Sequence, residues 1–138
     1  MTALGGIMFA TININTTSSE EFRDITSLIE EKVRVSGIKE GVATVFIPHT
    51  TAAITINENA DHSVVEDIIS SLDKIIPPRG HYSHMEGNSH AHIKSSIIGS
   101  SRQIIIQNGR LKLGTWQGIY FCEFDGPRNR QVWVKISS

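Results

Sequence analysis

The sequence predicts an α+β domain with a mostly antiparallel sheet and two main helices, and three observations lead to this fold class. Segments rich in β-branched residues, several with alternating apolar and polar side chains, occur near both ends of the chain. Two segments with apolar residues at helical spacing lie between them. The pair Asn108-Gly109 is a strong signal for a two-residue hairpin, which joins antiparallel strands. A chain of 138 residues has the size of one domain, so we expect a single domain over residues 1–138.

The first helix is predicted over residues 18–37. Ser18 with Glu21 three residues later matches a capping box, and Gly37 is typical of a helix end. The apolar positions at helical spacing are Phe22, Ile25, Ile29 and Val33.

The second helix is predicted over residues 59–78, where Pro77-Pro78 ends it. Its apolar stripe consists of Val64, Val65, Ile68, Ile69 and Leu72. Residues 79–91 have no core periodicity and are predicted to form a loop, followed by a short helix that Gly99 ends. Strands are predicted over residues 7–15, 42–49, 51–57, 101–107, 110–125 and 130–137, and the strand over 110–125 is interrupted by Gly114.

The composition excludes several classes of partner and suggests a compartment. The formal charge is −1 and basic residues are scattered, so we expect neither a nucleic acid nor an anionic membrane as a partner. No apolar run reaches the length of a membrane span, and the N-terminus does not resemble a signal peptide. Cys122 is the one cysteine and reads as a small core residue, which favours a reducing, cytoplasmic location.

A histidine-rich segment is the first candidate for a functional site. The segment "HYSHMEGNSHAHIKSS" contains His81, His84, His90 and His92. Imidazole binds zinc and similar ions, and Glu86 could complete such a shell or act as a base. His81 and His84 are three residues apart, and His90 and His92 are two apart. Neither spacing is a full metal signature, so a set of solvated loop histidines is the alternative.

Other polar residues stand where sites are often built, each with a structural alternative. His49 follows a predicted buried strand and precedes two threonines. Lys94 with Ser95 and Ser96 could contact an anion, although a solvated helix start explains them as well. Arg128 could clamp a carboxylate or phosphate, or form a surface ion pair.

Three further residues could belong to a functional site or have only a structural role. Trp116 could stack on a flat ring or lie in the core, and Gln117 would need partners if it were buried. Asp67 could be a solvated helix residue or a base.

Several motifs in order resemble one family. The segments "PHTTAAITINEN", "HIKSS" and "GTWQGIYFCEFDGPR" resemble the YjbQ-like family, also called the secondary thiamine-phosphate synthase family. The resemblance runs from about residue 10 to the C-terminus. It implies a sandwich-like fold, a homotrimer, and a polar pocket that often holds a metal ion.

The resemblance also implies roles for individual residues. His49 matches its "HT(T/S)A" motif, His84 its "H…EG" segment and His92 its "HIKSS" motif, and these three are the expected metal ligands. The expected divalent ion is zinc or a similar metal at the histidines, with Mg²⁺ as an alternative for a diphosphate substrate. His81 and His90 match no fixed histidine and are expected to be bystanders.

The activity implied is a thiamine-phosphate synthase that joins hydroxymethylpyrimidine diphosphate to a thiazole phosphate. Its small phosphorylated substrate would be bound by Lys94, Ser95, Ser96, Trp116, Gln117 and Arg128, with Lys94 also acting in catalysis. The first alternative is a metal-dependent hydrolase with Glu86 or Asp67 as the base. The second alternative is a non-enzymatic, trimeric metal- or anion-binding protein.

Overall fold

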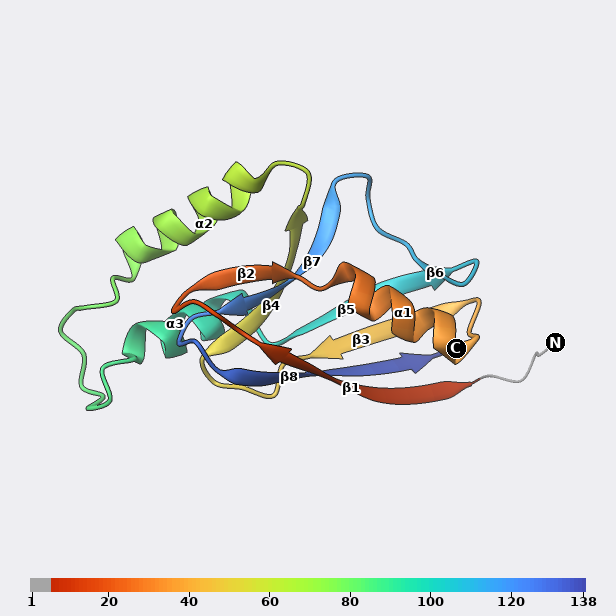
Figure 1. The fold of residues 1–138 in the computed structure, drawn as a ribbon, viewed down its shortest axis with the longest axis horizontal. Helices are drawn as coiled ribbons and strands as arrows, with labels where there is room; N and C mark the ends of the chain where they lie inside the picture. The colour runs from red at the N-terminus through yellow and green to blue at the C-terminus, as the bar shows by residue number, and fades with distance from the viewer. Residues whose placement is uncertain (1–5) are drawn as a thin grey trace.

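The structure, a computed structural model, describes residues 6–138 as two antiparallel sheets with three helices (Figure 1). The larger sheet has the strand order β1-β8-β3-β5-β6, and the smaller has the order β2-β7-β4. The predicted α+β class with antiparallel pairing is therefore confirmed. The elements are β1 (Ile7–Asn15), β2 (Glu21–Asp24), α1 (Thr26–Ser36), β3 (Gly41–Phe46), β4 (Ala52–Glu58), α2 (His62–Ile75), α3 (Ser89–Ile98), β5 (Ser101–Gln107), β6 (Arg110–Leu111), β7 (Gln117–Glu123) and β8 (Asn129–Ser137).

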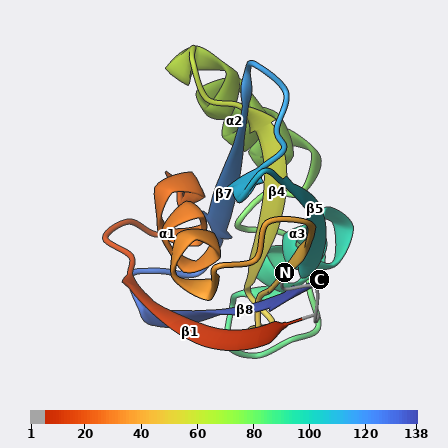
Figure 2. The ribbon, with the colours of Figure 1, turned by 90° about the vertical axis from the view of Figure 1, so that its right-hand side faces the viewer.

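The main core lies between the larger sheet, α1 and one face of the smaller sheet. Val33 of α1, Val134 of β8 and Phe121 of β7 are fully buried in it. Figure 2 shows α1 above β1 and β8, with β7 and β4 rising beside it. Because side chains alternate along a strand, β7 contributes every second residue to this core.

A second core covers the opposite face of the smaller sheet. Tyr120 and Cys122, which alternate with the main-core residues of β7, pack there with Val65 of α2 and Ala91 of α3. Burial in this apolar layer raises the pKa of the Cys122 thiol, as expected for a core cysteine. The smaller sheet is thus covered on both faces, and α3 is held against β4.

The first helix begins later than predicted. The carboxylate of Glu21 accepts hydrogen bonds from the backbone N–H groups of Thr17 and Ser18, much as in a capping box. The chain then extends into β2 instead of a helix, because β2 pairs with β7 and buries Phe22 in the second core. Tertiary pairing has overridden the local signal. Gly37 ends α1 with a φ of 71°, as predicted.

The remaining element predictions are mostly confirmed. The second helix is present as α2, and the side chain of Asp61 caps it by accepting from the N–H of Ser63. The short helix is present as α3 but starts at Ser89, so His90 is helical. The strand predicted over residues 110–125 is wrong in part, because residues 112–116 leave the sheet and β7 joins the smaller one.

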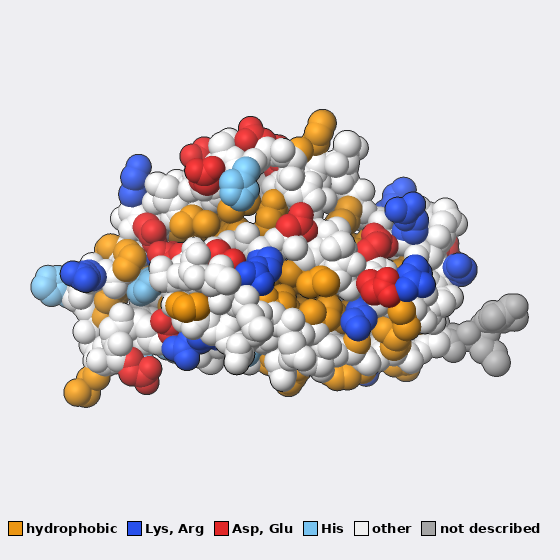
Figure 3. Space-filling model, viewed as in Figure 1, with side chains coloured by type: hydrophobic (Ala, Val, Ile, Leu, Met, Phe, Trp, Pro, Cys, Tyr) orange, Lys and Arg blue, Asp and Glu red, His pale blue; other side chains and the backbone are white. Residues whose placement is uncertain are grey.

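The surface of the molecule carries mixed charge. Figure 3 shows acidic and basic side chains interspersed on the face displayed, without a large area of one sign. Within residues 6–138, no helix is long and apolar enough to cross a membrane.

Candidate functional site

A polar pocket of about 410 Å³ opens where the start of α3 meets the segments that follow β3 and β7. We call it the histidine pocket, because all three histidines expected as metal ligands line it. Its lining residues are Pro48, His49, Thr50, Thr51, His84, Glu86, Asn88, His92, Asp125, Arg128 and Arg130.

His84 and His92 form a close pair in this pocket. Their ring centroids are 5.3 Å apart and the rings are inclined at 89°. Two imidazoles bound to one zinc ion at about 2.1 Å, with a tetrahedral angle, would have centroids roughly 5 Å apart. Glu86 Oε1 lies 3.8 Å from His84 Nε2. The pair therefore fits a shared transition-metal ion without a large movement.

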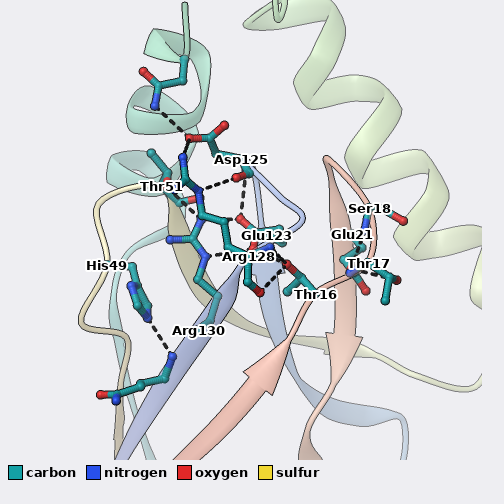
Figure 4. Close-up of polar contacts among 12 residues, drawn as sticks. Thr16, Thr17, Ser18, Glu21, His49, Thr51, Glu123, Asp125, Arg128 and Arg130 are labelled. Atoms are coloured by element: carbon teal, nitrogen blue, oxygen red, sulfur yellow. Dashed lines mark hydrogen bonds and ion pairs between the residues drawn. The ribbon is translucent and has the colours of Figure 1, made fainter. Parts of the chain in front are cut away.

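His49 is arranged differently. Its Nε2 accepts a hydrogen bond of 2.8 Å from the backbone N–H of Gln131 (Figure 4). Burial and the nearby Arg130 hold the pKa of His49 below its usual value, so the ring is neutral near pH 7. Because a backbone N–H can only donate, the ring proton must be on Nδ1. In this arrangement His49 can donate into its surroundings, but neither ring nitrogen is free to bind a metal.

The expected three-histidine shell is thus only partly assembled. Among residues 6–138 there is no group of three His, Cys, Asp or Glu side chains close enough together to hold a metal ion. The imidazoles of His84 and His92 lie close enough to share one ion, but no third side chain in the described part of the chain lies close enough to join them.

A buried ion pair lies beside the histidine pocket, and its arginine, Arg130, lines the pocket. Arg130 Nε donates to Glu123 Oε1 at 2.9 Å, and its Nη2 donates to Glu123 Oε2 and to Thr51 Oγ1. Burial opposes ionisation of Glu123, but the bonds from Arg130 and Thr16 outweigh it and hold its pKa below the usual value. In Figure 4 the guanidinium of Arg130 lies between Glu123 and His49.

A second arginine, Arg128, is also held by a carboxylate residue, Asp125, at the exposed side of the pocket. Arg128 donates from Nη2 to Asp125 Oδ2 at 2.9 Å and from Nε to the Asp125 carbonyl at 2.8 Å. The same Oδ2 accepts from Asn88 Nδ2 at 2.8 Å, which ties α3 to this turn. Burial would raise the pKa of Asp125, but the bonds from Asn88 and Arg128 hold it below its usual value.

Each arginine keeps one nitrogen unpaired. Among the described residues, neither the Nη1 of Arg128 nor that of Arg130 has a hydrogen-bond partner. Arg130 is buried as a residue, but its Nη1 is not fully buried, and the residue lines the histidine pocket. Two fixed guanidinium groups therefore offer donors at one pocket.

Lys94 does not line the histidine pocket, and this position contradicts the expectation that Lys94 contacts a substrate there. The side chain is fully buried, and Nζ lies 3.1 Å from Glu20 Oε2, 2.5 Å from Asp73 Oδ1 and 3.1 Å from His90 Nδ1. Residues two apart on a helix point in different directions, so Lys94 faces inward while His92 lines the pocket. All three ammonium protons have protein partners.

Its two serine neighbours are also outside the pocket. Ser95 is buried, and its Oγ has no partner among the described residues. Ser96 Oγ donates to the carbonyl of His92 one turn earlier. Neither serine lines the histidine pocket.

Three other expected site residues lie elsewhere. Asp67 borders an apolar hollow along α2. Trp116 is 63% exposed in the loop before β7, and Gln117 Oε1 accepts from the N–H of Gly114 in the same loop. Of the predicted substrate-binding residues, only Arg128 lines the histidine pocket.

Sequence reasoning missed Asn88 and Arg130, and it placed Asp125 at the turn with Arg128 without giving it a site role. Arg130 had a usable signal, because it occupies the same alternating register as the buried Val132 and Val134 of β8. A charge at an inward position requires a partner, and Glu123 at the end of β7 supplies it.

Comparisons with known proteins identify the family. A family model described as "UPF0047 protein YjbQ-like" matches residues 10–138. The UPF0047 protein MJ1081 of Methanocaldococcus jannaschii is 55% identical over 123 residues, which cover 89% of each chain. The UPF0047 protein YugU of Bacillus subtilis is 51% identical over 130 residues, which cover 94% of this chain and 98% of YugU.

Solved structures agree with this match. A YjbQ/UPF0047 protein from Clostridium acetobutylicum is 61% identical with a TM-score of 0.91, over 92% of this chain and 98% of that one. A YbjQ-like protein of Sulfolobus solfataricus, SSO2532, is 35% identical with a TM-score of 0.94, over 98% and 99%. The fold is that of the small α+β proteins of the YjbQ type. The chain belongs to the UPF0047 family of YjbQ-like proteins.

These comparisons overturn the expected thiamine-phosphate synthase activity. The relatives are described only as UPF0047 proteins, a name that assigns no reaction, and SSO2532 is described as a protein of unknown function. The burial of Lys94 removes the cation that we had expected beside a departing diphosphate.

Proposed function

We propose that the histidine pocket binds a small anionic ligand that bears a phosphate or carboxylate group. The observation that carries this proposal is the pair of braced guanidinium groups, Arg128 and Arg130, at one pocket. A guanidinium fixed by a carboxylate loses little further side-chain entropy when it binds, and its planar fork matches an oxyanion.

The neutral His49 supports the same proposal. Its Nδ1–H is a donor, while the Asp125 carboxylate is occupied by Asn88 and Arg128. Arg128 is paired with Asp125 and Arg130 with Glu123, so the two arginines give the pocket no strong net charge. Recognition would rest on the placement of donors more than on a long-range field.

The binding proposal can be tested with inorganic phosphate as the probe, measured by calorimetry. Arg128→Gln removes a donor at the rim and is expected to lower the affinity about 10-fold or more, the loss of one charge-assisted hydrogen bond. Arg128→Lys keeps the charge but not the fork and is expected to recover only part of the affinity.

Arg34→Gln is the matched control, because Arg34 is an exposed α1 arginine paired with Glu31 and lies outside the pocket. No phosphate binding by the wild type, or equal losses in the Arg34 and Arg128 variants, would rule the proposal out.

A divalent transition-metal ion at His84 and His92 is the second candidate ligand, supported by the ring spacing and inclination of this pair. Such an ion would supply a Lewis acid beside the anion, and the two imidazoles would hold it. Glu86 is the only one of the three expected catalytic residues that lines the pocket, so a catalytic role there remains a prediction.

Equilibrium dialysis against Zn²⁺ and Ni²⁺ tests the metal proposal. His84→Ala and His92→Ala should each lower the bound metal, while His62→Ala, at the start of α2 and outside the pocket, should not. Retention of metal by His49→Ala would separate a two-imidazole arrangement from the expected three-histidine one. Unchanged metal content in both the His84 and His92 variants would exclude this site.

A further inference from the structure

A second polar cavity, of about 280 Å³, shares Arg130 with the histidine pocket. Its other lining residues are Asn13, Asn15, Asn129 and Gln131. These four residues all carry a neutral carboxamide, so we call the cavity the amide pocket. It forms on the outward surface of β1 and β8, because the four residues are exposed and alternate with buried residues along both strands.

The strand register gathers the four carboxamides into one cluster. Asn13 lies opposite Gln131, and Asn15 lies opposite Asn129. Directly opposite residues of an antiparallel pair have Cβ atoms about 5 Å apart, and positions two apart on one strand are separated by about 7 Å. The four side chains therefore surround an area close in size to a single sugar ring.

Most of the hydrogen-bonding capacity of this cluster is unused. Of the four carboxamides, only that of Gln131 has a partner within residues 6–138, because its Oε1 accepts from Trp133 Nε1 at 3.1 Å. This bond orients Gln131 and leaves its Nε2 available as a donor. Each of the three asparagines offers two N–H donors and an oxygen acceptor, so the cluster can both donate and accept.

Local structure gives no reason for one of these residues, Asn13. Asparagine is depleted in strands and favours turns and caps, where its side chain bonds to nearby backbone groups. Asn13 lies within β1, between the buried Ile12 and Ile14, and its side chain makes no such bond to the described residues. Residues that act against their local structure are common at functional sites, so Asn13 supports a binding role for the cluster.

The amide pocket and the histidine pocket adjoin each other. Arg130 lines both cavities. The backbone N–H of Gln131, in the amide pocket, donates to Nε2 of His49, in the histidine pocket, at 2.8 Å (Figure 4). One small ligand can therefore place different groups in the two cavities.

We propose that this ligand is a sugar phosphate or a similar phosphate ester of a polyhydroxylated molecule. The inference rests on the proposed anion site at Arg128 and Arg130, which would hold the phosphate, and it adds hydroxyl recognition by the amide pocket. The carboxamides are neutral, so they suit an uncharged polar group and would leave a second charged group without a partner.

Hydroxyl groups match the cluster because each hydroxyl both donates and accepts a hydrogen bond. A site built from such groups discriminates strongly against a ligand that lacks the matching hydroxyls, since its own polar groups are then left unpaired. The amide pocket would therefore distinguish a sugar phosphate from inorganic phosphate.

Calorimetry on the full chain with inorganic phosphate, ribose 5-phosphate and glucose 6-phosphate tests this inference. At least one of the two sugar phosphates is expected to bind at least about 10-fold more tightly than inorganic phosphate. Asn13→Val and Asn129→Val each remove a carboxamide and are expected to lower this affinity ratio about 3- to 10-fold. Because valine favours strands, thermal unfolding should show that both variants are at least as stable as the wild type.

Asn57→Val is the matched control, because Asn57 is an exposed strand asparagine of β4 that lines neither pocket. It should keep the affinity ratio of the wild type. Phosphate binding with no preference for either sugar phosphate, or equal ratios in all three asparagine variants, would overturn this inference and leave the anion site standing. No binding of inorganic phosphate by the wild type would instead overturn the proposed function, and this inference with it.

Discussion

Replacing Lys94 with methionine tests whether this lysine is structural, as the fold indicates, or contacts a ligand, as its motif suggested. Lys94 is fully buried, and its ammonium group bonds to Glu20, Asp73 and His90 on three different segments. Methionine has a similar shape but would leave two carboxylates facing each other without a cation. Breaking a fully buried pair by removing one partner typically costs about 3–5 kcal/mol. Because the Asp73 side chain is 34% exposed, solvent screens it and we expect a loss at or below the lower end of this range.

The pH dependence of this loss has a defined sign. Burial raises the pKa of Asp73, but the bonds from Lys94 and Glu20 outweigh it, and the net pKa is lowered. Ionised Asp73 therefore adds stability that is present above its unfolded pKa and lost as the pH falls through its folded pKa. For Glu20, burial and the bond to Asp73 raise the pKa, so this carboxyl takes up a proton first on acidification. Without Lys94 both carboxyls would favour protonation, so the variant should lose most stability near neutral pH and less in acid.

Urea unfolding followed by circular dichroism, near pH 7 and near pH 4.5, measures both effects. Lys112→Met is the control, because Lys112 is exposed in the loop after β6. Folded Lys94→Met should bind phosphate as the wild type does, unlike Arg128→Gln. A loss below about 1 kcal/mol, or an equal loss at both pH values, would refute the structural role.

Three further predictions concern Arg130, Cys122 and Asp61. Arg130→Met should destabilise the fold by about 3–5 kcal/mol, because Glu123 would be left charged and fully buried. Adding Glu123→Gln should recover part of this loss in urea unfolding, and no recovery would contradict the pairing. Cys122 should react with a thiol reagent only as fast as the chain unfolds, because its thiol is buried and its pKa is raised, and labelling of the folded chain within seconds would contradict this. Asp61→Ala should lower the free energy of unfolding through loss of the α2 cap, whereas Asp61→Ser should lower it less in the same assay.

The histidine pocket could be predicted only in part. Motif resemblance selected His49, His84 and His92 from distant segments, and all three line one pocket. The same resemblance gave Lys94 a ligand role, although the inward direction of its side chain depends on how α3 packs against α2 and the segment before β2. A motif reports which residues occur together, but not which of them face the same space.

Local signals failed where distant pairing competed with them. Ser18 and Glu21 carry the pattern of a helix start, and the corresponding hydrogen bonds form. The segment nevertheless becomes β2, because pairing with β7 buries Phe22. Similarly, residues 110–125 are predicted as one strand interrupted by Gly114, yet they are divided between two sheets.

The sequence by itself determined the α+β class, the end of α1 at Gly37 and the hairpin at Asn108-Gly109. These features depend on neighbours within a few residues, through backbone conformation and local hydrogen bonds. The tertiary structure alone decided that Lys94 is buried and that Arg130, paired with the buried Glu123, lines the histidine pocket. Each of these depends on contacts between distant segments, whose burial and charge pairing are fixed only when the sheets and helices pack.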